Sequence, residues 1–148
     1  MHVLVVGGAG YIGSHMLRCL DAAGVEVTTL DNLSSGRRES VTAGELVVGD
    51  LGDRPLLDQL FGQTKFDGVM HFAAHIEVGE SVVDPAKYYL NNVVRTQVLL
   101  DAMRDHGVNN FIFSSTAAIF GEPVQATIDE RHPKNPINPY GRTKLMVE

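Results

Sequence analysis

A tyrosine and a lysine four residues apart, Tyr140 and Lys144, form a pair that suits acid–base chemistry. Residues at this spacing share one face of a helix, so the phenol and the ammonium group point the same way. A free tyrosine has a pKa of about 10 and is a poor base at neutral pH, but a neighbouring cation favours the phenolate. The pair therefore predicts a general base supported by a lysine. The alternative is that Tyr140 packs at a helix start while Lys144 is solvated.

Hydroxyl side chains close the set of candidate catalytic groups. Ser114, Ser115 and Thr116 stand at the end of an apolar run that is typical of a buried strand. Open α/β sheets hold their ligands at the carboxyl ends of the strands. A hydroxyl there could bind a substrate oxygen and relay its proton to Tyr140. The alternative is that these hydroxyls only satisfy the backbone of the following loop.

Three evenly spaced glycines, Gly7, Gly10 and Gly13, lie between a predicted strand and a predicted helix. Their spacing is a variant of the dinucleotide-binding fingerprint, in which glycines allow a tight turn, close approach of a pyrophosphate and close helix–sheet packing. The phosphates would sit at the positive N-terminus of the helix. Asp31 follows Gly13 by eighteen residues, near the distance expected for a carboxylate that accepts both hydroxyls of the adenosine ribose. The alternative is a glycine turn in an unrelated α/β protein.

The charge of Asp31 also favours NAD over NADP. A carboxylate there would repel the 2′-phosphate of NADP, since two like charges a few Å apart cost about 1–4 kcal/mol at partly exposed sites. Arg37 and Arg38 follow closely and could in principle meet that phosphate. We expect them to be solvated loop residues instead, and NAD to be the cofactor.

Two histidines, His71 and His75, stand at a spacing used by metal ligands. However, His71 lies in a predicted strand, the glutamate of the H-E-x-x-H motif is missing, and no acidic third ligand is obvious. We therefore expect no metal site.

Short apolar runs alternate with helical patterns along the chain, which predicts a parallel sheet covered by helices on both faces. The predicted strands are Val3–Val6, Val25–Leu30, Leu46–Val48, Val69–Ala73 and Phe111–Ser114. The predicted helices are Tyr11–Ala23, Leu56–Phe61, a long helix from Pro85 (after an Asp84 cap) to Gly107, and a last helix from Pro139 (after an Asn138 cap). The fold class is thus α/β, a three-layer doubly wound parallel sheet of the Rossmann type. We expect residues 1–148 to form one NAD-binding domain, interrupted in its last helix.

Composition limits the remaining possibilities. The 148 residues are 44% hydrophobic and 20% charged, which suits a globular domain. A formal net charge of −6 argues against nucleic acid as a partner. No apolar run approaches the roughly 20 residues of a membrane span, so we expect no membrane partner. The single cysteine, Cys19, allows no intrachain disulfide and suits the cytoplasm; we expect it to be buried.

The motifs together resemble the extended short-chain dehydrogenase/reductase family over all 148 residues. The resemblance rests, in order, on "GGAGYIGSH", "DNLSSG", "HFAA…VGESVVDPAKYY…NNV", "NFIFSSTAAIFGE" and "NPYGRTKLMVE". It is greatest to members that epimerise a UDP-hexose at C4, in galactose metabolism, through a transient 4-keto sugar. It implies a UDP-sugar substrate, NAD regenerated in each cycle, and a homodimer.

The resemblance also assigns residues. For cofactor binding it implies Gly7, Gly10, Tyr11, Ile12, Gly13, Asp31, Asn32, Leu33, Ser34, Ser35, Gly36, Asp50, Leu51, Phe72, Ala73, Ala74, His75, Ile76, Asn91, Tyr140 and Lys144. For catalysis it implies Tyr140 as the base, Lys144 as its supporting cation and Thr116 as the hydroxyl, with Thr116 and Tyr140 also contacting substrate. Ile76 departs from the pattern, because the best-known branch carries a lysine there.

Family members are usually more than twice as long as this chain, and their C-terminal domain grips the UDP-sugar. We therefore expect the 148 residues alone to be inactive. Three alternative functions stay open: a 4-epimerase that acts on another nucleotide sugar, a related nucleotide-sugar enzyme, and a non-catalytic NAD-binding module. A 4,6-dehydratase is disfavoured, because Ala117 and Ala118 stand where its relatives carry an acid–base pair.

Overall fold

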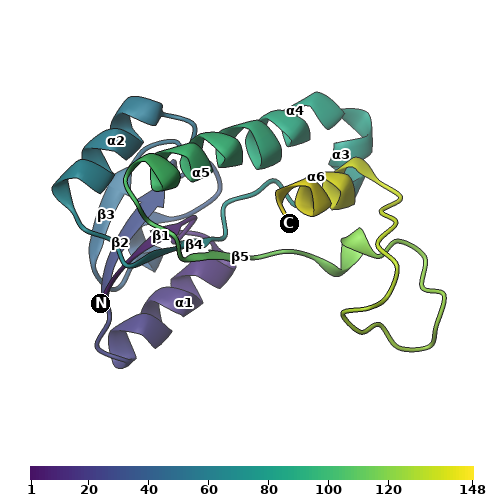
Figure 1. Ribbon diagram of the computed structural model, residues 1–148, viewed down its shortest axis with the longest axis horizontal. Helices are drawn as coiled ribbons and strands as arrows, with labels where there is room; N and C mark the ends of the chain where they lie inside the picture. Colours follow the sequence, from purple (N-terminus) through teal and green to yellow (C-terminus); the bar gives the residue numbers. More distant parts are fainter. The chain divides into compact units, whose positions relative to one another are not determined.

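The computed structural model describes residues 1–148, and the chain forms two compact units. Unit 1 comprises Met1–Ala73 and Thr96–Ser114, and unit 2 comprises Ala74–Arg95 and Ser115–Glu148. Figure 1 shows the sheet and its covering helices in unit 1 and the short helices of unit 2. The assignment of all 148 residues to a single NAD-binding domain stays a prediction.

Unit 1 is built on a five-stranded parallel sheet in the order β3-β2-β1-β4-β5. The strands are β1 (His2–Val6), β2 (Glu26–Asp31), β3 (Glu45–Val48), β4 (Gly68–His71) and β5 (Phe111–Phe113). The order reverses beside β1, since β2 and β3 extend the sheet on one side and β4 and β5 on the other. The carboxyl ends of β1 and β4 therefore form the switch point where sheets of this kind bind ligands.

Helices cover both faces of this sheet. On one face, α1 (Tyr11–Ala22) packs Leu17 and Leu20 against Val3 and Val5 of β1. On the other face, α2 (Arg54–Gln63) and α5 (Arg95–Asp105) form a larger apolar cluster with the side chain of Leu4. Alternate residues of β1 thus point into two separate cores, as the pleat requires. The predicted three-layer, doubly wound parallel sheet is confirmed.

Two details of unit 1 differ from the sequence-based expectation. Cys19 is exposed rather than buried, because α1 turns Leu17 and Leu20 toward the sheet and leaves Cys19 on its outer side. Helix α2 begins at Arg54 and not at Leu56. Its N-cap is Asp53, whose carboxylate accepts from the backbone N–H of Leu56 at 3.2 Å.

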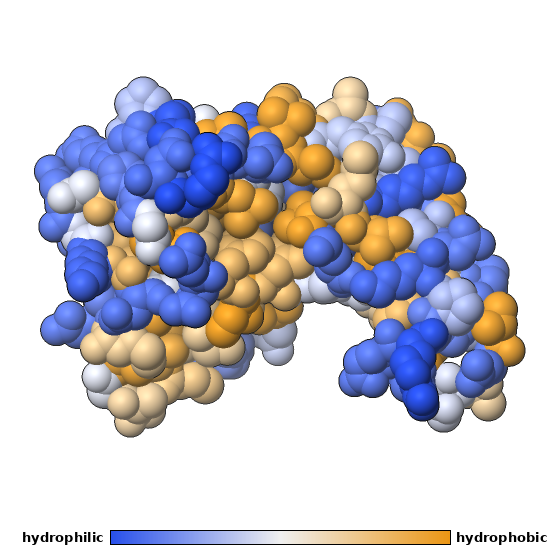
Figure 2. Space-filling view, in the orientation of Figure 1, coloured by the Kyte–Doolittle hydropathy of each residue, from blue (hydrophilic) through white to orange (hydrophobic).

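The outer surface of α2 and α5 is charged. The guanidinium of Arg54 contacts Asp58 at 2.9 Å and Asp105 at 2.7 Å, and His106 Nε2 lies 3.0 Å from Asp58. Figure 2 shows hydrophilic residues over α2. No helix of the chain has the length and apolar character to cross a bilayer.

Unit 2 consists of short helices: α3 (Val78–Val83), α4 (Pro85–Tyr89), the π-helical turn η2 (Leu90–Val94), the 3₁₀ turn η3 (Ala117–Ile119) and α6 (Pro139–Val147). Both cap signals read from the sequence are confirmed. The side chain of Asp84 accepts from Lys87 N–H at 3.1 Å, and that of Asn138 accepts from Gly141 N–H at 2.8 Å.

The long helix predicted from Pro85 to Gly107 is interrupted. The segment Leu90–Val94 adopts π-helical hydrogen bonding between α4 and α5. Helix α3 was not predicted at all, because its six residues are too few for a helical period to show.

Two helical glycines differ in whether the surrounding structure leaves room for a side chain. Both Gly13 and Gly62 are helical, but a Cβ on Gly13 would lie 2.2 Å from the carbonyl oxygen of Gly7, whereas a Cβ on Gly62 would meet nothing within 4 Å. We expect Gly62→Ala to raise the free energy of unfolding by about 0.5–1 kcal/mol and Gly13→Ala to lower it. Urea denaturation of both variants checks this. A stabilising Gly13→Ala would contradict the close packing of α1 on the glycine-rich turn.

Candidate functional site

The glycine-rich turn in unit 1 leaves no room for side chains on the side that faces the sheet. Gly7 has φ of +83°, and a Cβ there would lie 2.5 Å from the backbone nitrogen of Ala73. A Cβ on Gly13 would lie 2.2 Å from the carbonyl oxygen of Gly7, whereas a Cβ on Gly10 would stand 3.4 Å from the same oxygen, which is close to an ordinary contact distance. The backbone therefore forms a bare cradle between the end of β1 and the start of α1, as a pyrophosphate requires.

The N-terminus of α1 is open to a negatively charged ligand. Its N-cap is Gly10, no side chain caps it, and its first turn carries no acidic residue. The first two helical residues are exposed, Tyr11 by 83% and Ile12 by 54%. The first N–H groups of a helix lack intrahelical partners and carry the positive end of its dipole. This end of α1 fits the phosphates of a dinucleotide.

The carboxylate of Asp31 is held in place by two backbone donors. One oxygen accepts from Ala9 N–H at 2.9 Å and the other from Leu33 N–H at 2.8 Å. Each carboxylate oxygen can accept more than one hydrogen bond, so both retain capacity for a ribose diol. The contact with Ala9 also ties Asp31 to the glycine-rich turn.

The segment from Asp31 to Gly36 folds back on that turn. The backbone N–H of Arg37 donates to the carbonyl of Ala9 at 3.1 Å, and a Cβ on Gly36 would lie 2.7 Å from the Cβ of Ala9. The amide of Asn32 donates to Asp50 at 3.0 Å. This bond ties Asp50, another predicted cofactor-binding residue, to the segment. Arg37 and Arg38 are exposed, consistent with solvated loop residues.

The end of β4 completes the group of candidate cofactor residues in unit 1. The N–H groups of Phe72 and Ala73 both donate to the carbonyl of Val6, at 2.8 and 3.1 Å.

Leu51 is buried, with its side chain in the larger apolar cluster. His71 belongs to the core: it is 1% exposed and its Nε2 lies 2.9 Å from Thr96 Oγ1. No group of three metal-ligating side chains occurs in the chain.

Helix α6 carries the candidate base and lysine in unit 2. Asn138 caps it and Pro139 begins it, which places Tyr140 and Lys144 one turn apart in a helix that starts where the sequence predicted. A Cβ on Gly141 would lie 2.6 Å from the carbonyl oxygen of Ala118. The first turn of α6 therefore packs closely on η3, the segment that Thr116 caps with its side chain at 3.2 Å from Ala118 N.

Lys144 is a buried lysine. Only 3% of it is exposed, and burial lowers the pKa of its ammonium group to about 8, because a low-dielectric surrounding disfavours the charged form. At pH 7 the group is still mostly protonated. A cation is thus retained on the same helix as Tyr140.

The π-helical turn buries two consecutive asparagines, Asn91 and Asn92. The amide of Asn92 accepts from His75 N–H at 2.9 Å and donates to the His75 carbonyl at 3.0 Å, so it holds that backbone at both polar groups. Asn91 donates to Asn92 at 3.0 Å. Burial, and then the charge of Lys87, lower the pKa of His75. Of these residues Asn92 was not predicted, although two asparagines in mid-helix, where they are poor helix formers, were a signal.

The predicted site residues thus divide between the units. Unit 1 brings together Gly7, Gly10, Tyr11, Ile12, Gly13, Asp31, Asn32, Leu33, Ser34, Ser35, Gly36, Asp50, Leu51, Phe72 and Ala73. Unit 2 holds Ala74, His75, Ile76, Asn91, Thr116, Tyr140 and Lys144. Ile76 is 61% exposed.

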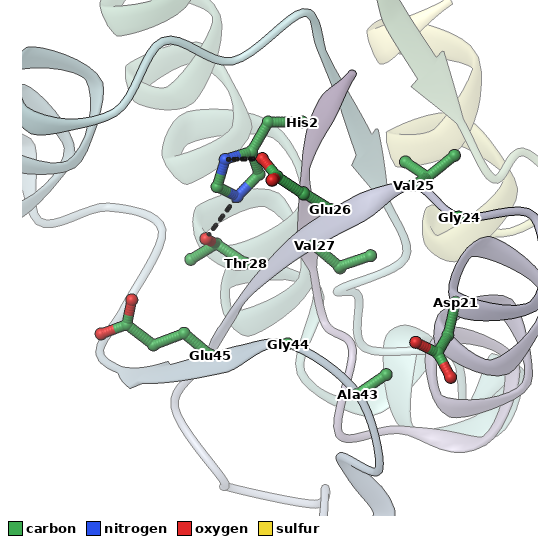
Figure 3. A pocket seen from close by; sticks show the side chains of 10 residues that line it. All are labelled: His2, Asp21, Gly24, Val25, Glu26, Val27, Thr28, Ala43, Gly44 and Glu45. Atoms are coloured by element: carbon green, nitrogen blue, oxygen red, sulfur yellow. Dashed lines mark hydrogen bonds and ion pairs between the residues drawn. The ribbon is translucent and has the colours of Figure 1, made fainter.

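A hollow of about 580 Å³ opens at the amino-terminal ends of β1, β2 and β3 in unit 1. Figure 3 shows it lined by His2, Glu26 and Glu45, which are the first residues of β1, β2 and β3. His2 lies 2.9 Å from Thr28 Oγ1 and 3.6 Å from Glu26. Because ligands of such sheets bind at the carboxyl ends of the strands, we do not place the cofactor here.

Comparison with known proteins agrees with this geometry. The family model described as "NAD dependent epimerase/dehydratase family" matches residues 3–148. The chain belongs to this NAD-dependent epimerase/dehydratase family. The UDP-glucose 4-epimerase of Rhizobium leguminosarum bv. trifolii is 53% identical over 148 residues, which are 99% of this chain and 45% of that protein.

Solved structures of family members show the same fold. The UDP-glucose 4-epimerase of Brucella ovis in complex with NAD is 50% identical, with a TM-score of 0.96 over 98% of this chain and 45% of that one. The enzyme from Bifidobacterium longum in complex with NAD⁺ and UDP is 37% identical, with a TM-score of 0.93 over 98% and 46%. The expected cofactor, NAD, is confirmed by the family and these structures. The chain spans about half the length of the relatives it matches.

The role of Asp31 is tested by replacing its carboxylate with the amide of asparagine. We expect Asp31→Asn to weaken NAD binding about tenfold, roughly 1.4 kcal/mol, because a ribose acceptor is lost; NADP binding falls less, because the repulsion of the 2′-phosphate is lost too. Calorimetric titration of both cofactors measures the ratio. Asp21→Asn removes the same charge at the hollow of Figure 3 and should change neither affinity. An unchanged NAD/NADP ratio in Asp31→Asn would contradict the assignment.

The buried Lys144 predicts a stability that depends on pH. Its pKa is about 8 in the folded chain and about 10.4 when unfolded, so the unfolded state binds more protons between these values and stability rises with pH across that window. The variant Lys144→Met has no titrating group at this position. We expect its free energy of unfolding, relative to that of the wild type, to fall by about 2 kcal/mol from pH 7 to pH 9.5. Urea denaturation without cofactor measures it; parallel pH curves would contradict the burial of a titrating lysine.

Proposed function

We propose that this chain serves the NAD-dependent epimerisation of a UDP-hexose at C4, interconverting UDP-galactose and UDP-glucose. The observation that carries the proposal is α6, on which Tyr140 and the buried Lys144 stand one turn apart beside the segment that holds Thr116. The names of the relatives support it, and the bound UDP of the Bifidobacterium enzyme supports a UDP-sugar substrate.

Unit 1 is proposed to bind the adenosine and pyrophosphate parts of NAD. The glycine-rich turn and the uncapped start of α1 would receive the phosphates, and Asp31 the ribose diol. Asn32, Asp50 and the end of β4 would extend these contacts. The support lies in the bare cradle and in acceptors already fixed by backbone donors.

Unit 2 is proposed to supply the catalytic groups. Tyr140, as phenolate, takes the proton of the sugar 4-hydroxyl, and Thr116 hydrogen-bonds the same oxygen. Lys144 supplies the nearby positive charge that favours a phenolate and binds the cofactor. NAD, when bound, would supply the hydride acceptor and donor for C4 of the sugar. Tyr140 then gives the proton back, so the cycle leaves it unchanged.

We propose that binding of the UDP-sugar also requires residues outside these 148. Because the relatives are about twice as long, we expect a polypeptide of these 148 residues alone to turn over no UDP-galactose, since positioning supplies much of the barrier reduction. We also propose that the active protein is a homodimer located in the cytoplasm.

Replacing the base tests the proposal. In a longer polypeptide that contains these residues, Tyr140→Phe should lower kcat for UDP-galactose at least 10²-fold, because general-base catalysis contributes about 10²–10⁴-fold, and should leave NAD bound. A coupled assay for UDP-glucose measures turnover. Tyr89→Phe, another half-buried tyrosine of unit 2, is the matched control with unchanged kcat. Substantial turnover by Tyr140→Phe would rule out the assigned base.

A further inference from the structure

Ser81 is a fully buried serine in α3 whose hydroxyl has two partners. It donates to the carbonyl of Val78 at 2.6 Å within its own helix. It accepts from the backbone N–H of Tyr140 at 3.2 Å, fifty-nine residues along the chain. All three residues belong to unit 2.

The second contact meets a need that α6 cannot meet by itself. The first N–H groups of a helix have no acceptor in the preceding turn. Pro139 has no N–H, and the Asn138 side chain accepts from Gly141 at 2.8 Å. Tyr140, between them, is the second residue of α6, and its N–H finds its acceptor in Ser81.

The carbonyl of Tyr140 is held as well. Thr143 Oγ1 donates to it at 2.7 Å, and that buried hydroxyl accepts from the amide of Asn92 at 3.2 Å. Both polar groups of the Tyr140 backbone therefore meet buried hydroxyls. Of the two, only Ser81 comes from a different helix.

We propose that Ser81 is a positioning residue for Tyr140, an inference that rests on the proposed function. Because the proton of Ser81 is committed to Val78, its lone pairs are directed to the Tyr140 N–H. This fixes the first turn of α6 against α3 and limits the positions of the phenol attached to it. Alanine in place of Ser81 removes the acceptor, so the first turn of α6 frays and Tyr140 samples unproductive positions.

The contact is tested in the 148-residue chain by amide hydrogen exchange. Ser81→Ala should speed exchange of the Tyr140 amide at least tenfold. The matched control is Tyr88→Phe, which removes the bonds from Tyr88 Oη to Glu77 O at 2.8 Å and to Glu80 at 2.9 Å but keeps the Ser81 hydroxyl. It should leave the Tyr140 amide as protected as in the wild type. Unchanged Tyr140 exchange in Ser81→Ala would overturn the proposal.

The consequence is tested by assaying UDP-galactose turnover in a longer polypeptide that contains these residues. Ser81→Ala should lower kcat about tenfold with KM and the Kd of NAD within twofold, and Ser81→Thr, which keeps an acceptor, should recover most of the loss. Tyr88→Phe should keep its kcat. A Ser81→Ala protein with wild-type kcat overturns the positioning role. A wild-type protein that binds NAD but never epimerises refutes the proposed function instead, whatever the exchange data show.

Discussion

Unit 1 depends on the close approach of the turn after β1 to the ends of its neighbours. The backbone at Gly7 comes so near Ala73, and that at Gly13 so near Gly7, that any side chain would force them apart. This closeness seats α1 on the sheet, while the first two residues of α1 stay exposed and no side chain caps the helix. The same constraint brings Asp31 and the segment up to Gly36 onto Ala9. Packing and the proposed phosphate site are therefore one requirement on the sequence.

Unit 2 is stabilised in a different way. Its buried polar side chains include Ser81, Asn92, Thr143 and Lys144. Ser81 and Asn92 bond to backbone groups of other segments, at Tyr140 and His75, and Asn92 also donates to Thr143. Directional bonds of this kind fix positions more narrowly than apolar contacts do, but each leaves an unsatisfied group if one partner is lost. An arrangement of this kind suits residues proposed to handle protons, because small displacements change proton transfer strongly.

Much of the fold could be predicted because its signals are local. The alternation of apolar runs with helical patterns gave the sheet and its layers, and the Asp84-Pro85 and Asn138-Pro139 pairs marked two helix starts correctly. The exposure of Cys19 was missed because it was assigned to the wrong face of α1. The start of α2 was missed because the Asp53 cap was not recognised. Helix α3 was missed because six residues are too few to show a helical period. The π-helical turn and the Ser81 contact were missed because their partners are distant in sequence. The division of the site residues into two units was not visible for the same reason.

The π-helical turn has a consequence for how this part of the chain tolerates insertions and deletions. A π turn holds one residue more than the α-helical turn it replaces. Removing a single residue from Leu90–Val94 would thus let the segment relax into a regular α-helix, with α-helical backbone hydrogen bonds in place of the π-helical ones. Asn91 or Asn92 would then rotate off its buried face, and the backbone of His75 would lose the amide that holds it. The length of this stretch, as much as its composition, is therefore fixed by what it contacts.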